Sequence, residues 1–345
     1  MKVKKLNLII IFVALIGIIG YVGLTEAQNI VSLIHKLDFL WITGVILLMV
    51  GYWLLETLTL HFITKKFHPR QKFQSSLQTT MIGQFFNCIT PFSSGGQPMQ
   101  ALHMVKTGIP FGIASSCLLT KFIIYQVVLT LYSLVVLCMK LSEFSAKVSG
   151  FTYMVLFGFL VNTVVVIALL SIGCFKRFTM QVVFKIINKL EKMKLIKDGA
   201  GKKHYVLREF ESFYKSFEWI KSHKKMILYT VVLSILQLTV YFLVPYFILR
   251  AFGLNASAFS MIAAQAFVLM ISSFVPLPGA AGGAELSFFT FFKLFFPANL
   301  LNISVLVWRL VTFYLTVCVG MCFTLWQKGN TENTNLTEKV ATKFL

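Results

Sequence analysis

The stretch Thr90–Gln100, TPFSSGGQPMQ, decides the fold, because it is a polar loop between two apolar segments. It contains two prolines, two adjacent glycines, two serines and two glutamines. Proline and glycine break helices, and the serines and glutamines are poorly suited to contact with lipid. The loop therefore predicts a break in an otherwise apolar helical region.

Composition places the chain in a membrane. Of its 345 residues, 57% are hydrophobic, 15% are aromatic and only 13% are charged. A soluble domain carries about 25% charged residues. The six cysteines lie in apolar segments without a CxxC pair or a nearby histidine cluster, so we expect free thiols. We assign no metal site, cofactor or catalytic residue.

Six apolar runs are long enough to cross a bilayer, which takes about 20 residues as a helix. The runs are Leu6–Thr25, Phe39–Ile63, Phe111–Met139, Phe151–Phe175, Met226–Arg250 and Leu301–Trp326. The first run lacks a small-residue cleavage site, so we interpret it as an anchor rather than a signal peptide.

Basic residues predict the orientation of these spans, because loops rich in Lys and Arg stay in the cytoplasm. The segment Lys176–Lys225 holds 14 basic residues against five acidic ones, whereas Thr25–Asp38 is nearly neutral. We therefore place both termini and the basic linker 176–225 in the cytoplasm. The tail, residues 328–345, is polar and is expected to be disordered.

This orientation leaves two apolar stretches that must enter and return on the same side, residues 74–106 from the cytoplasm and 255–299 from outside. Each has a Pro/Gly break near its middle, which is typical of a re-entrant hairpin buried in protein or lining a wet cavity. The predicted fold class is an all-α polytopic membrane protein of about six spans and two hairpins, together forming one membrane domain over residues 1–327.

The two breaks share a sequence pattern. Both contain P-x-x-x-G-G, beginning at Pro91 and Pro278, an offset of 187 residues. A basic residue follows each proline, Lys121 after 30 residues and Arg309 after 31. The spans around the two hairpins run in opposite directions, so the pattern indicates inverted repeats whose broken helices point at a midplane site. The alternative is that the glycines only allow close helix packing.

Polar groups at membrane depth indicate what such a site would bind. Exposed successive amides and a half-helix N-terminus attract anions. Glu56, Lys121, Glu285 and Arg309 lie inside apolar runs, where an unpaired charge costs about 2.5–3.5 kcal/mol. We expect two acids and two bases to pair around one cavity, with purely structural ion pairs as the alternative.

Three stretches resemble the membrane domain of the lysylphosphatidylglycerol synthase family, the flippase-like part of the multiple peptide resistance factor. They are IGQFFNCITPFSSGGQPMQALHMVKTGIP (82–110), FVPLPGAAGGAELSFFTFF (274–292) and WRLVTFYLTVCVG (308–320). Full-length members add a cytosolic aminoacyltransferase domain, whereas only 19 residues follow Trp326 here. The resemblance implies a bacterial cell membrane protein that carries the modified lipid to the outer leaflet and contributes to resistance to cationic antimicrobial peptides.

Residues and resemblance together give the candidate substrate-binding set. It comprises Glu56, Pro91, Ser93, Ser94, Gly95, Gly96, Gln97, Lys121, Pro278, Gly282, Gly283, Glu285 and Arg309.

The expected function is a lipid translocase for an anionic or aminoacylated phospholipid such as lysylphosphatidylglycerol, or for another lipid phosphate. Two alternatives remain: a phosphatidylglycerol lysyltransferase, or a scaffold that recruits a separate synthase through the helix Gln181–Lys197. We expect no enzyme activity from the chain by itself. Anionic lipid head groups are the expected partner of the basic linker, a second copy of the chain is left open, and nucleic acid is not expected.

Overall fold

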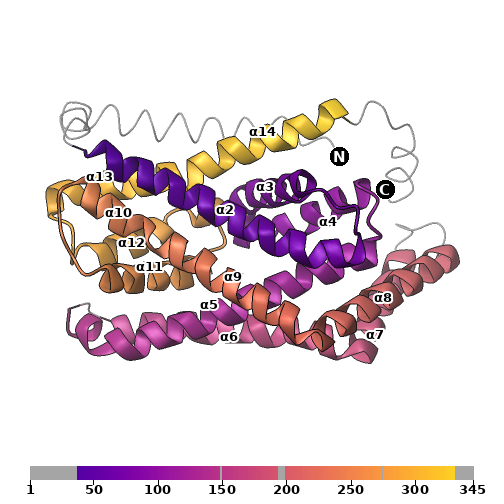
Figure 1. The fold of residues 1–345 in the computed structure, drawn as a ribbon. Helices are drawn as coiled ribbons and strands as arrows, with labels where there is room; N and C mark the ends of the chain where they lie inside the picture. Colours follow the sequence, from indigo (N-terminus) through magenta and orange to yellow (C-terminus); the bar gives the residue numbers. More distant parts are fainter. Residues whose placement is uncertain (1–36, 148–149, 193–198, 274, 331–345) are drawn as a thin grey trace.

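The computed structural model describes residues 37–147, 150–192, 199–273 and 275–330. Every regular element in these ranges is helical (Figure 1). The expected span Leu6–Thr25 and the tail from residue 331 onward lie outside the described residues.

Five helices or helix pairs in the described residues are long and apolar enough to cross a membrane. They correspond to the five runs expected from Phe39 onward. They are α2 (Phe39–Phe67), α5 (Phe111–Lys147), α6 (Phe151–Cys174), α9 (Lys224–Phe242) with α10 (Val244–Ala251), and α13 (Ala298–Arg309) with α14 (Leu315–Asn330).

Two of these spans change helical geometry part-way. Pro245 lies in the first turn of α10, where it lacks the amide that would have continued α9. The turn Leu310–Tyr314 between α13 and α14 is π-helical, with the amide of Leu315 bonded to the carbonyl of Leu310. A π-turn inside a helix is rare and often lies at a functional site. Here it directly follows Arg309.

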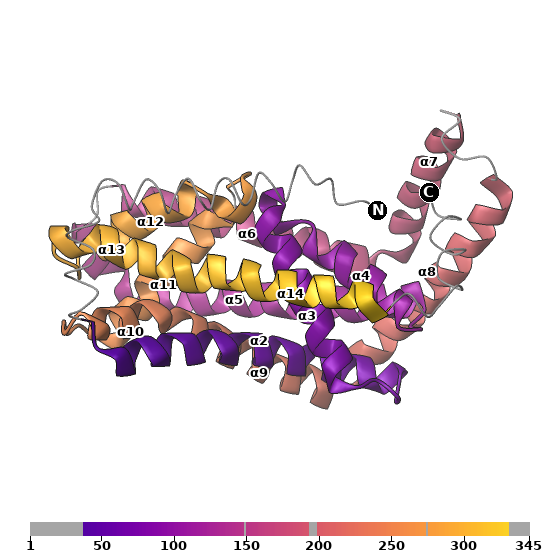
Figure 2. The same ribbon diagram turned by 90° about the horizontal axis from the view of Figure 1, so that it is seen from above.

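Two pairs of shorter helices form the hairpins. In the first, α3 (Phe73–Ile89) packs against α4 (Gly96–Lys106), and in the second α11 (Ala258–Ser272) packs against α12 (Gly283–Phe292). Figures 1 and 2 show the first pair in one half of the elongated bundle and the second pair in the other half. The 3₁₀ turns at the tips, Pro91–Ser93 and Pro278–Ala280, contact each other. Entry into a membrane from opposite sides stays a prediction.

The 3₁₀ turns of the two tips have the same backbone conformation, whereas the glycines that follow differ, with Gly95 at φ −80° and Gly282 at φ 80°. The middle residue of each 3₁₀ turn is left-handed, Phe92 at φ 54° and ψ 20° and Gly279 at φ 62° and ψ 16°. The third residue is left-handed as well, Ser93 at φ 51° and Ala280 at φ 53°. These positions are separated by the same 187 residues as the P-x-x-x-G-G motifs. The repeat is therefore a repeat of structure as well as of sequence.

Two glycines allow close packing in or against the first hairpin. A Cβ on Gly96 would lie 2.7 Å from the carbonyl oxygen of Gly83, across the α3–α4 contact. A Cβ on Gly320 would lie 2.8 Å from the carbonyl oxygen of Met81, across the α3–α14 contact. For Gly96 the structure therefore supports the close-packing alternative.

The interior differs between the two halves of the bundle. Around α11 and α12 it is aromatic, with completely buried rings from Phe144, Phe267, Phe288, Phe291 and Phe292. Around α2, α3 and α5 it carries many buried hydroxyls, from Thr57, Thr64, Ser76, Thr79, Thr80, Ser116 and Thr120. The half that contains the first hairpin therefore combines apolar clusters with many buried hydroxyls.

The basic segment expected as a linker is largely helical and partly docked. It forms α7 (Lys176–Lys192) and α8 (Gly199–Ser222), and α8 packs along α5. The amide of Gly112 donates to Glu209 Oε2 at 2.7 Å, and the Tyr214 hydroxyl donates to the carbonyl of Ile172 at 2.7 Å. Both helices lie at one end of the bundle, where α2 also ends (Figure 2). We call this the basic end.

Candidate functional site

The contact between the two tips brings most of the candidate residues together. Ser93 and Ser94 in the first tip and Ala281 in the second are exposed, although the turns pack against one another. Gly95, Gly96 and Gln97 lie at the start of α4, and Gly282, Gly283 and Glu285 at the start of α12. Two half-helix N-termini therefore lie on either side of the tip contact.

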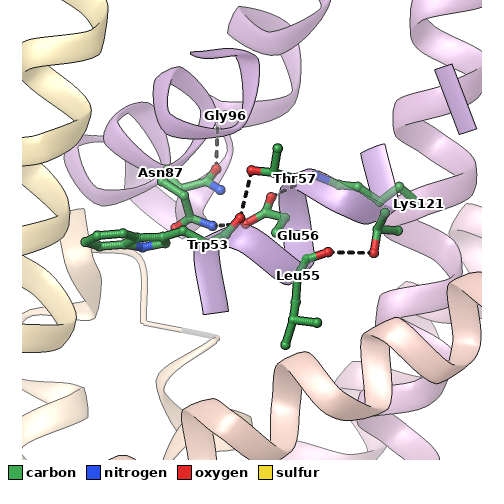
Figure 3. Close-up of polar contacts among 9 residues, drawn as sticks. Trp53, Leu55, Glu56, Thr57, Asn87, Gly96 and Lys121 are labelled. Atoms are coloured by element: carbon green, nitrogen blue, oxygen red, sulfur yellow. Dashed lines mark hydrogen bonds and ion pairs between the residues drawn. The ribbon is translucent and has the colours of Figure 1, made fainter. Parts of the chain in front are cut away.

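The amides of the first tip are not free. The amide of Gly95 donates to Thr90 Oγ1 at 2.8 Å, and the amide of Gly96 donates to Asn87 Oδ1 at 3.0 Å (Figure 3). The two side chains satisfy donors that a helix start would otherwise leave unpaired. The expectation that Gly95 and Gly96 present bare amides to an anion is wrong for this conformation, because Asn87 and Thr90 already accept from them.

The second tip is more open. Gly282 has a φ of 80°, which favours glycine, and a Cβ there would meet nothing within 4 Å. In the described part of the chain, no acceptor is bonded to the amides of Gly282 and Gly283. Within the described residues, the second tip therefore keeps the unbonded amides that the sequence predicts for both tips.

Arg309 holds the second tip. Its Nη1 donates to the carbonyl of Gly279 at 3.0 Å. Its Nε lies 2.7 Å from Glu285 Oε1 and forms an ion pair with it. The Arg309 side chain is 11% exposed and the Glu285 side chain 32%. The pair thus lies at the tip, and Glu285 is its more exposed member.

This pair has unused hydrogen-bonding capacity. Arg309 Nη2 and Glu285 Oε2 are buried atoms with no hydrogen-bond partner. One is a cationic donor and the other an anionic acceptor, and buried polar groups are ordinarily satisfied. The pair thus keeps one cationic donor and one anionic acceptor that are not committed to hydrogen bonds within the protein.

The second ion pair is satisfied internally. Lys121 Nζ on α5 donates to Glu56 Oε1 on α2 at 2.7 Å, and the two side chains are only 8% and 10% exposed (Figure 3). Gln84 Nε2 on α3 donates to the other oxygen of Glu56. Glu56 therefore joins three helices around one carboxylate.

The four charges thus form two separate pairs, Glu56–Lys121 and Glu285–Arg309, rather than one cluster. The sequence interpretation missed Gln84, Asn87 and the carbonyl of Gly279. The signal for the first two was present, since both are amides inside the apolar stretch MIGQFFNCI. A backbone carbonyl leaves no signal in a sequence.

Apolar spans, two helical pairs that meet at broken tips, and charged pairs beside them define a multi-pass membrane protein with an internal polar site. The family described as lysylphosphatidylglycerol synthase TM region matches residues 8–320, and the chain belongs to this family. It is also 26% identical over 302 residues to a UPF0104 membrane protein of Archaeoglobus fulgidus, covering 86% of this chain and 89% of that protein.

The exposed tip residues give a direct prediction. In a background with all six cysteines replaced by serine, cysteines at Ser94 and Ala281 should both react with a small water-soluble thiol reagent in membranes. The reason is that both positions are exposed beside the tip contact. A cysteine at the completely buried Ala264 is the matched control and should stay unlabelled. Protection of both tip cysteines equal to that of the control would show that no water reaches the tips.

Proposed function

We propose that the chain is a translocase that moves an anionic or aminoacylated phospholipid, such as lysylphosphatidylglycerol, or another lipid phosphate, between the leaflets of a cell membrane. The observation that carries this proposal is the Glu285–Arg309 pair, with one spare acceptor and one spare donor at a broken tip. A lysylated phospholipid offers a phosphate to Arg309 and an ammonium group to Glu285.

The surrounding residues suit the same ligand. The free amides of Gly282 and Gly283 would add donors to a phosphate oxygen, as helix N-termini do at other anion sites. Ser93, Ser94 and Gln97 would line the opposite side from the first tip. Rocking of one repeat against the other would expose the site to each leaflet in turn. Glu56 and Lys121 belong to the same pathway, held together in this conformation.

The predicted orientation indicates what outward transport would change at the cell surface. With the basic end in the cytoplasm, as the distribution of Lys and Arg favours, a cationic lipid carried outward would lower the negative charge of the outer surface. A less negative surface attracts cationic antimicrobial peptides less strongly. We therefore propose that transport contributes to resistance against them.

A leaflet-resolved assay tests the function. The protein is reconstituted into vesicles of phosphatidylethanolamine and phosphatidylglycerol that contain a trace of acyl-labelled fluorescent lysylphosphatidylglycerol, phosphatidylglycerol or phosphatidylcholine. Dithionite bleaches the outer leaflet, so continued bleaching reports movement from the inner one. We expect movement of the first two probes, whereas rates equal to those of protein-free vesicles for every probe would reject the proposal. Newly formed lysylated lipid in the presence of charged tRNA would instead support the transferase alternative.

Two variants separate the roles of the pair. Glu285→Gln should slow the lysylated probe about tenfold and phosphatidylglycerol much less, because only the lysylated head group carries an ammonium. Arg309→Gln should slow both probes, because both carry the phosphate. Glu143→Gln, in the more exposed Lys140–Glu143 pair, is the matched control and should leave both rates unchanged. Equal effects of Glu285→Gln on both probes would contradict the assignment of the ammonium to Glu285.

A further inference from the structure

A row of polar side chains runs along α3 toward the buried ion pair. Ser76, Thr80 and Gln84 are spaced four residues apart, so they lie on one face of the helix. Ser76 and Thr80 are completely buried. At the inner end, Gln84 Nε2 donates to Glu56 Oε2. One face of α3 therefore leads from the start of the helix to the carboxylate of Glu56.

The outer end of the row meets a titratable side chain. His61 Nδ1 lies 3.1 Å from Ser76 Oγ. His61 also lines an open cavity of about 450 Å³ at the basic end, together with Phe62, Lys65, Lys66 and Pro69. Histidine is the side chain whose charge changes most readily near neutral pH. It thus stands between an open cavity and a buried row of hydroxyls.

Thr80, in the middle of the row, has an unsatisfied hydroxyl. Its Oγ1 is buried and has no hydrogen-bond partner, whereas the hydroxyl of the adjacent Thr79 donates to the carbonyl of Ser75. A step of four residues advances about 6 Å along a helix. Two hydrogen bonds of about 2.8 Å through one water span that distance. The unpaired hydroxyl of Thr80 is therefore where a buried water would find a partner.

We propose that this row is a proton path and that Glu56 is the site of a proton that is coupled to lipid movement. A proton leaves the imidazolium of His61 for Ser76 while Ser76 passes its own proton onward. Through Thr80 and the intervening waters the proton reaches Glu56, whose carboxylate becomes a neutral carboxylic acid. His61 regains a proton from a hydronium ion in the cavity, which becomes water. Only O–H and N–H bonds exchange, and no oxidant or reductant is needed.

The charges around Glu56 couple its protonation to lipid movement. This coupling rests on the proposed function. Protonation changes the Glu56–Lys121 pair from neutral to singly positive. An uncompensated buried charge is costly, so an anionic head group in the pathway would stabilise the protonated state. Other titratable or charged side chains lie near these groups. Tyr52 on α2 and Lys121 on α5 face Glu56, and Lys65 on α2 faces His61. Tyr125 on α5 and Tyr241 on α9 face Tyr52.

The first arm of the test follows the proton itself. Infrared spectra of the purified full-length protein in detergent should show a protonated-carboxyl band that grows as pH falls and is missing in Glu56→Gln. After a rapid pH drop, the band should appear roughly tenfold more slowly in Thr80→Val than in the wild type. Thr79→Val is the matched control and should respond as fast as the wild type. A band unaffected by Glu56→Gln, or equal rates in Thr80→Val and Thr79→Val, would overturn the proton path.

The second arm follows lipid in the same preparations. A pH gradient across the vesicles should change the rate of fluorescent phosphatidylglycerol movement in the wild type and leave it unchanged in Glu56→Gln. An infrared band from protonated Glu56 without any lipid movement would support the proton path and reject the translocase. Lipid movement without an infrared band from Glu56, or without an effect of the pH gradient, would support the translocase and reject the coupling of lipid movement to a proton.

Discussion

Lys121→Met should lower the free energy of unfolding by about 3–5 kcal/mol, the usual result of removing one partner of a buried ion pair. Lys121 is the cation that neutralises Glu56, and both side chains are at most 10% exposed. Without it the carboxylate keeps only the amide of Gln84, which carries no charge. Unfolding by SDS titration of the protein in dodecyl maltoside micelles would measure the loss.

Two further variants make this prediction specific. In the Glu56→Gln/Lys121→Met double variant most of the stability should return, because neither group is then a buried, unpaired charge. Lys140→Met is the matched single change in a pair whose side chains are 20% and 32% exposed, and it should cost less than about 1 kcal/mol. A Lys121→Met loss no larger than that of Lys140→Met would mean that water reaches Glu56 in the folded protein.

Gly279→Val should displace the second tip. Gly279 has a φ of 62°, which a β-branched residue adopts at a cost of about 1–3 kcal/mol. A Cβ there would also overlap the ring of Phe313, and such overpacking costs about 1–3 kcal/mol more. Because the carbonyl of Gly279 holds Arg309, we expect the variant to lose most lipid movement as well as roughly 2–6 kcal/mol of stability.

Gly253→Val is the control that separates the cost of the left-handed backbone conformation from the cost of the contact with Phe313. Gly253 has a φ of 72°, but a Cβ there would meet nothing within 4 Å. This control should therefore show the backbone cost alone, near 1–3 kcal/mol, and keep lipid movement. Equal stability losses in Gly279→Val and Gly253→Val, with transport intact in both, would show that the contact of Gly279 with Phe313 does not position the tip.

The hairpins could be predicted from sequence because their signals are local. Paired glycines next to a proline end a helix whatever surrounds them, so Thr90–Gln100 marks the first tip without any tertiary information. The same holds for the spans, whose length and composition are set by the bilayer. Within the described residues, the structure has five apolar helices or helix pairs of spanning length and two packed pairs of shorter helices at these positions. That the two pairs are re-entrant in a membrane stays a prediction.

The partners of the charged and polar groups could not be predicted in the same way. Glu56 lies 65 residues from Lys121 and 28 from Gln84, so their meeting depends on how α2, α3 and α5 pack. The amide of Gly96 looked free because its acceptor, Asn87, lies on the other arm of the hairpin. Which of two similar tips stays open to a ligand is therefore a property of the packed structure.

The π-turn beside Arg309 has a consequence for how this site can change during evolution. A π-turn holds one more residue than the α-turn that it replaces, so it corresponds to a single-residue insertion. One residue shifts the phase of a helix by about 100°. The direction of the Arg309 guanidinium is thereby uncoupled from the face of α14 that packs on α3. The gain or loss of that one residue would turn Arg309 relative to α14 and leave the packing of α14 on α3 unchanged.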